Sequence, residues 1–176
     1  ERPLWRHSVA VAVAAREISN ALKLRCGEEA FLCGLLHDIG KLLLMRHDAE
    51  IYEQIEELSD EQARVELEQE IYNFTHAEIG ALVANRWGLA DEVGRAIFDH
   101  HHPIKDQQMP LMTLIIDAAD KLANATGFGL RAEGNPEMSG LPSLAALKFT
   151  DEQVAEIWEC TETRIDEMMS VLSSLI

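Results

Sequence analysis

The stretch FLCGLLHDIGKL, residues 31–42, places a histidine and an aspartate at the end of an apolar run. A buried histidine beside a buried aspartate is unfavourable unless both groups are hydrogen-bonded or bound to a metal ion. Imidazole nitrogen and carboxylate oxygen are ligands that divalent iron, manganese, nickel and zinc accept. His37 and Asp38 therefore indicate a metal site, and a hydrogen-bonded histidine–aspartate pair at a helix end is the alternative.

Lys41 follows this pair within one helical turn. Residues three or four positions apart share a helix face, so we expect its ammonium group to reach an anionic substrate or the Asp38 carboxylate. In an enzyme, Asp38 and Lys41 would then be the catalytic residues. An ordinary surface lysine is the alternative.

The sequence around this stretch has helical periodicity, and no β-alternation persists. Thr75 with Glu78 and Thr150 with Gln153 match the capping-box pattern that marks a helix start. We therefore predict an all-α bundle of about six to eight helices around the metal site. The expected elements are helices over 4–24, 28–45, 75–87, 91–101, 110–125 and 150–176, an acid-rich stretch over 49–70 forming the solvated face of one or two helices, and a surface loop over 127–142.

Composition limits the classes of protein to which the chain can belong. Its 176 residues fit a single domain over 1–176, and a formal net charge of −16 repels phosphate backbones, so we expect no nucleic-acid partner. No apolar run approaches the roughly 20 residues of a membrane span. Three cysteines without a CxxC pair are typical of reduced thiols in the cytoplasm. Because the first residue is Glu1, we expect a segment of a longer protein.

Further histidines and a later aspartate occur in recognisable segments. His7 lies in LWRHSVAVA, His76 opens HAEIGALVANRWGL, the pair His100-His101 lies in AIFDHHHP, and Asp120 lies in DAADKLA. In this order the residues resemble the HD superfamily of metal-dependent phosphohydrolases, and most closely the bacterial HDOD signalling domain, over residues 4–125. The HD pair alone is a weak signal, but its combination with the other segments is specific.

The resemblance implies that these distant side chains converge at one site holding one or two divalent transition metal ions: iron, manganese, nickel or zinc. The implied metal ligands are His7, His37, Asp38, His76, His100, His101 and Asp120. Asp120 is preferred because the aspartate of the family precedes an apolar stretch, and Asp117 is the reserve. His47 and His102 fall outside the pattern, and we expect both to be exposed.

Three departures from related proteins bear on function. HD-GYP phosphodiesterases carry a GYP signature soon after the histidine pair, whereas residues 103–108 read PIKDQQ, which argues against cyclic di-GMP as substrate. Some relatives hold a third metal with a glutamate at the position of Pro3, so we expect no third metal. HDOD domains also usually have further N-terminal helices, so the chain is expected to be a partial domain.

Two functions remain open on these grounds. The resemblance favours a signal-transduction domain that binds metal, with other signalling domains or proteins as partners. The alternative is an active binuclear phosphohydrolase or phosphodiesterase acting on a nucleotide or another phosphoester, in which Asp38 bridges the metals and Lys41 stabilises charge on the phosphoryl oxygens. The sequence leaves the oligomeric state open.

Overall fold

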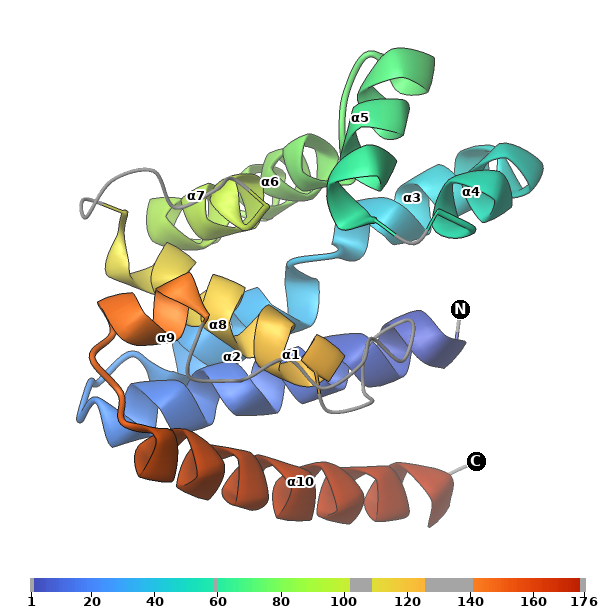
Figure 1. The fold of residues 1–176 in the computed structure, drawn as a ribbon. Helices are drawn as coiled ribbons and strands as arrows, with labels where there is room; N and C mark the ends of the chain where they lie inside the picture. The colour runs from blue at the N-terminus through green and yellow to red at the C-terminus, as the bar shows by residue number, and fades with distance from the viewer. Residues whose placement is uncertain (1, 59, 102–108, 126–140, 175–176) are drawn as a thin grey trace.

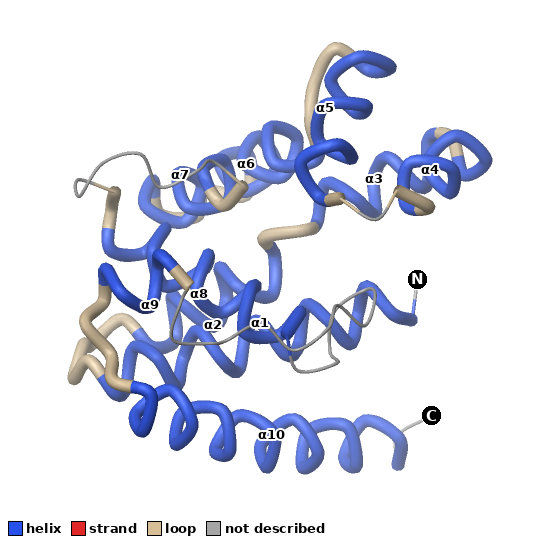
Figure 2. The backbone as a smooth tube through the Cα atoms, viewed as in Figure 1, coloured by secondary structure: helices blue, strands red, loops and turns tan. Residues whose placement is uncertain are grey.

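The computed structural model describes residues 2–58, 60–101, 109–125 and 141–174, and these ranges contain helices and no strand (Figures 1 and 2). The expected all-α class is confirmed. In chain order the helices are α1 (Arg2–Ala21), α2 (Gly27–Leu36), α3 (Ile39–His47), α4 (Ala49–Glu56), α5 (Glu61–Tyr72), α6 (His76–Arg86), α7 (Asp91–Asp99), α8 (Leu111–Ala125), α9 (Pro142–Ala146) and α10 (Asp151–Ser174).

Helix α1 is the centre of the bundle and contacts α2, α8 and α10. Its residues 9–15 are alanine and valine, and all are 0% exposed. A helix that is apolar on every side is typically buried by its neighbours, and this segment is surrounded in that way. Small side chains also allow close packing: a Cβ on Gly34 of α2 would lie 2.8 Å from the Cα of Ala12. Figure 1 shows α10 running along one side of α1, with α6 and α7 on the other side of the molecule.

The helix is interrupted at His37 and Asp38, where one continuous helix over 28–45 was expected. That expectation is wrong: α2 ends at Leu36, and α3 begins at Ile39 after Asp38 leaves the helical region at φ −101° and ψ 12°. The turn lets α3 leave the bundle and approach α6, which it contacts. The approach is close at Gly40, where an added Cβ would lie 1.9 Å from the carbonyl oxygen of His76.

The acid-rich stretch forms two helices, α4 and α5, which we call the α4–α5 arm (residues 49–72). Asp48 and Asp60 cap the two helices, accepting hydrogen bonds from the backbone N–H groups of Ile51 at 3.2 Å and Ala63 at 2.9 Å. The arm has its own small apolar cluster, centred on Leu44, Tyr52 and Ile55, apart from the main core. Figure 1 shows α4 beside α3 at the edge of the molecule, and α5 rising between α3 and α6.

The other expected helices are present and begin and end near the expected residues. Both capping boxes are present, at the starts of α6 and α10. The short helix α9 was not expected, and most of the expected loop over 127–142 lies outside the described residues. Leu82 of α6 is 66% exposed. Among the described helices, none has the length and apolar character needed to cross a membrane.

Candidate metal centre

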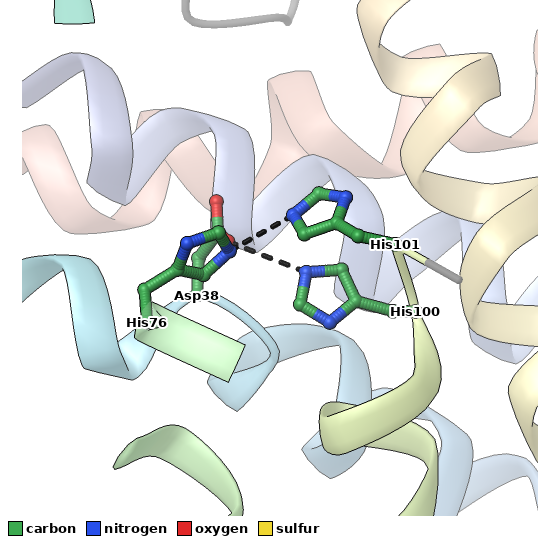
Figure 3. A group of neighbouring side chains, drawn as sticks. All are labelled: Asp38, His76, His100 and His101. Carbon is green, nitrogen blue, oxygen red and sulfur yellow. Dashed lines mark hydrogen bonds and ion pairs between the residues drawn. The ribbon is translucent and has the colours of Figure 1, made fainter. Parts of the chain in front are cut away.

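Side chains from α1, the turn between α2 and α3, α6, the end of α7, and α8 converge inside the bundle. Two groups have ligand atoms within 4.8 Å of one another, the first comprising Asp38, His76, His100 and His101, and the second comprising His7, His37 and Asp120. Figure 3 shows the first group, with the three imidazole rings gathered around the Asp38 carboxylate. The seven residues implied by the family resemblance thus lie together, although more than a hundred positions separate the first from the last.

Three of the histidines are oriented by hydrogen bonds made on their outer side. The Nδ1 atoms of His37 and His100 lie 2.7 Å and 2.6 Å from the carbonyl oxygens of Gly34 and Ile97. The Nδ1 atom of His76 lies 2.7 Å from Oε2 of Glu68. A proton on Nδ1 satisfies each of these acceptors, so in the neutral ring the Nε2 atom carries the lone pair. This is the arrangement of metal-binding histidines, whose second nitrogen usually donates to a carbonyl or carboxylate group.

Several ligand atoms that face the middle of the cluster make no hydrogen bond to the described residues. The Nε2 atoms of His37 and His100 and the Oδ1 atom of Asp38 have no hydrogen-bond partner among the residues that the structure describes. The Nε2 atoms of His76 and His101 face each other at 2.8 Å. Two such lone pairs repel unless a proton or a metal ion lies between them. The donor set therefore fits a divalent transition metal ion.

Charge around the cluster is only partly balanced. Lys41 is buried rather than on the surface, and its Nζ lies 2.8 Å from Oδ2 of Asp38. His7 Nε2 lies 3.0 Å from Oδ1 of Asp120. Burial opposes the charge on Asp38, yet the neighbouring His37 and Lys41 hold its pKa well below the usual value. Burial lowers the pKa of His37 to about 4, so its ring is neutral at pH 7 and available as a ligand.

Asp120, and not Asp117, points to the histidines. Its Oδ1 atom also lies 3.8 Å from His37 Nε2, whereas the Asp117 carboxylate, one turn earlier on α8, forms an ion pair with Lys121 at 2.6 Å. His47 is exposed at the end of α3, and His102 lies outside the described residues.

Sequence reasoning missed two glutamates of α5. Glu68 is 1% exposed, and besides the ring of His76 it accepts hydrogen bonds from the backbone N–H of His76 at 2.8 Å and the Tyr52 hydroxyl at 2.8 Å. Glu61 forms a third group of possible ligands with His101 and Asp120. The acid-rich composition of residues 49–70 predicts a solvated helix face, on which glutamates have no special role. The i, i+7 spacing of Glu61 and Glu68, which places both on one helix face, was the available signal.

The cluster is almost closed to solvent. His7, His37, Asp38, His76, His100 and Asp120 are each at most 3% exposed, and only His101 of the seven is less buried, with a side chain 10% exposed. Closed sites are typical of structural metal ions, whereas catalytic sites keep one coordination position open to water or substrate.

Comparison with known proteins agrees with the fold. The model of the HDOD domain family matches residues 1–103. Among solved structures, an HDOD domain protein of unknown function from Geobacter sulfurreducens is 22% identical with a TM-score of 0.73, over 98% of this chain and 62% of that chain. A provisionally described signal transduction protein from Marinobacter aquaeolei VT8 is 22% identical with a TM-score of 0.76, over 96% of this chain and 38% of that chain.

Two other relatives carry less specific names. A provisionally described phosphohydrolase from Shewanella amazonensis SB2B is 24% identical with a TM-score of 0.60, over 89% of this chain and 62% of that chain. An uncharacterized protein from Treponema pallidum (strain Nichols) is 32% identical over 76 residues, which are 42% of this chain and 15% of that protein. The chain thus spans less than two thirds of the length of each of these proteins, and the structural matches establish the fold.

Proposed function

The chain belongs to the HDOD domain family, and we propose that it is a signal-transduction domain that binds one or two divalent transition metal ions without turning over a substrate. Burial is the observation that carries this proposal. Six of the seven candidate ligands are at most 3% exposed, so an unmatched set of imidazoles and carboxylates is costly without a cation. The same burial keeps most of the ligand atoms away from solvent.

The candidate ligands divide between the two groups defined above. Asp38, His76, His100 and His101 would hold one ion, and His7, His37 and Asp120 would hold the other. When bound, such ions supply Lewis acidity and can lower the pKa of a water molecule. Lys41 neutralises part of the charge on Asp38 at 2.8 Å, and its 4% exposure places it against the cluster rather than toward a substrate in solution.

An active phosphohydrolase is the second candidate, and the complete histidine–aspartate set favours it. In that case Asp38 and Lys41 would be the catalytic residues, and a segment of the chain would have to move to admit a phosphoester. The structural relative from Shewanella amazonensis carries the provisional name of a phosphohydrolase, so phosphoester hydrolysis is assayed together with metal binding.

Elemental analysis of the full chain, purified without added metal, tests the proposal. We expect iron, manganese, nickel or zinc well above trace level, and no steady hydrolysis of p-nitrophenyl phosphate, bis(p-nitrophenyl) phosphate or cyclic di-GMP after loading with Mn²⁺ or Fe²⁺. A metal-free protein that also ignores all four ions in calorimetry would overturn metal binding. Steady turnover of any of the three phosphoesters would make the chain a phosphohydrolase.

The partners that we propose are other signalling domains or proteins rather than nucleic acid. The formal net charge of −16 supports this choice, because an acidic surface repels phosphate backbones. A pull-down with double-stranded DNA at low salt checks the exclusion.

A further inference from the structure

Helix α5 brings two carboxylates to the metal centre from outside the main core. Glu61 and Glu68 are seven positions apart and so lie on one face of the helix, at its first turn and near its end. Glu68 fixes the ring of His76 through the 2.7 Å contact to Nδ1. The arm also packs on α3 in the small apolar cluster of Leu44, Tyr52 and Ile55, to which α5 contributes the partly buried side chains of Leu67 and Tyr72.

Glu61 lies at the open side of the centre. Its Oε1 atom is 3.6 Å from Nδ1 of His101, and ligand atoms of Glu61, His101 and Asp120 lie within 4.8 Å of one another. The side chain of Glu61 is 34% exposed, whereas that of Asp120 is 5% exposed. Glu61 is therefore the carboxylate through which the buried cluster meets solvent.

Two carboxylates as close as Glu61 and Asp120 repel each other unless a cation lies near both or one of them is protonated. Four carboxylates, of Asp38, Asp120, Glu61 and Glu68, gather around the centre with one ammonium group, that of Lys41. That ammonium is already paired with Asp38 at 2.8 Å. A divalent ion near Glu61, Asp120 and His101 would supply the missing positive charge. The buried Nε2 atom of His100, which makes no hydrogen bond to the described residues, lies 3.6 Å from Oδ1 of Asp38 in the neighbouring group of ligands.

We propose that Glu61 is an additional metal ligand, so that metal occupancy fastens the α4–α5 arm to the bundle. The inference rests on the proposed metal binding and extends it to a helix outside the family's histidine–aspartate order. Because coupling between two equilibria is reciprocal, metal stabilises the docked arm, and anything that displaces the arm weakens metal binding. Metal binding would then change the position or mobility of the arm, and so the surface that the domain presents to a partner.

Glu61→Gln tests the inference, with Glu66→Gln as the matched control. Both change one carboxylate of α5 to an amide of the same size, but Glu66 is exposed and accepts a hydrogen bond from Gln62 at 2.9 Å. Co²⁺ is the probe, because its visible absorption spectrum reports a change of ligand independently of any activity. We expect Glu61→Gln to weaken Co²⁺ binding by at least about tenfold and to alter the spectrum, with Glu66→Gln matching the wild type.

Hydrogen exchange of the full chain supplies the second measurement. Co²⁺ should slow amide exchange in residues 49–72 of the wild type and of Glu66→Gln, and should leave it unchanged in Glu61→Gln. Wild-type affinity, spectrum and protection in Glu61→Gln, with Asp38→Ala unable to bind, would overturn the role of Glu61 while leaving the metal centre intact. A wild-type chain that binds no Co²⁺ would instead overturn the metal centre itself.

Discussion

Replacing Gly40 by alanine probes the close contact between α3 and the backbone of His76 at the start of α6. An added Cβ would lie 1.9 Å from the carbonyl oxygen of His76, 2.7 Å from its carbonyl carbon and 2.9 Å from its Cα. All three are backbone atoms, so no side chain can rotate away. Ordinary contact begins near 3.4 Å, and α3 and α6 must therefore separate by about 1.5 Å at this point.

The expected cost follows from that displacement. Overpacking of a core costs about 1–3 kcal/mol, and we expect the upper end of this range because rigid helices must move. Metal–ligand distances tolerate only about 0.2 Å, so shifting His76 should weaken metal binding by about 10–100-fold. Urea unfolding followed by circular dichroism measures the first effect, and calorimetric titration with Co²⁺ measures the second.

Gly27→Ala is the control for this experiment. A Cβ on Gly27 would lie 3.4 Å from Asn20 Oδ1 and 3.5 Å from Arg16 Cγ, both side-chain atoms. That variant should be neutral or more stable by up to about 1 kcal/mol, because alanine restricts the unfolded chain more than glycine does. A Gly40→Ala protein with wild-type stability and affinity would refute the close approach of α3 to α6 and the dependence of His76 on it.

Three further outcomes are expected. Asp38→Ala should stay folded but lose metal and about 3–5 kcal/mol of unfolding free energy, because it leaves Lys41 buried without its partner. The double variant Asp38→Ala/Lys41→Met should regain stability and not metal binding, which urea unfolding and elemental analysis distinguish. Cys33 is 0% exposed, and burial raises the pKa of its thiol to about 12, so iodoacetamide at pH 8 should label Cys26 and Cys160 of the native protein and leave Cys33 unmodified by mass spectrometry. The manganese-loaded chain should leave cyclic di-GMP intact in a chromatographic assay, since residues 103–108 lack the GYP signature; a linear dinucleotide product would contradict this.

Local patterns were sufficient to predict most helices but not the break at His37 and Asp38. Capping boxes and glycines act on neighbouring residues, so the starts of α6 and α10 and the end of α6, where Gly88 has a φ of +73°, can be read from the sequence. The break precedes Gly40, which packs against the backbone of His76, 36 positions later in the chain. Periodicity describes one helix at a time and cannot reveal such a contact.

The candidate site divides in a similar way. The family order brought His7, His37, Asp38, His76, His100, His101 and Asp120 into consideration, whereas spacing alone could not have assembled side chains from five parts of the chain. Glu61 and Glu68 were hidden among other acidic residues of α5, and only the fold distinguishes the glutamates that face the centre from Glu66, which faces water. Charge composition indicates how acidic a helix is, and packing decides where each charge points.

The complete burial of residues 9–15 of α1 has a consequence for biosynthesis. This alanine–valine segment is covered in part by α10, and 130 positions separate Ala21 from Asp151. At about 5–20 residues per second, a ribosome needs roughly 6–26 seconds to make the intervening chain. During that interval α1 has α2 as a partner but still exposes the surface that α10 will cover. We therefore expect the nascent chain to be a client of ribosome-associated chaperones until its last helix has emerged.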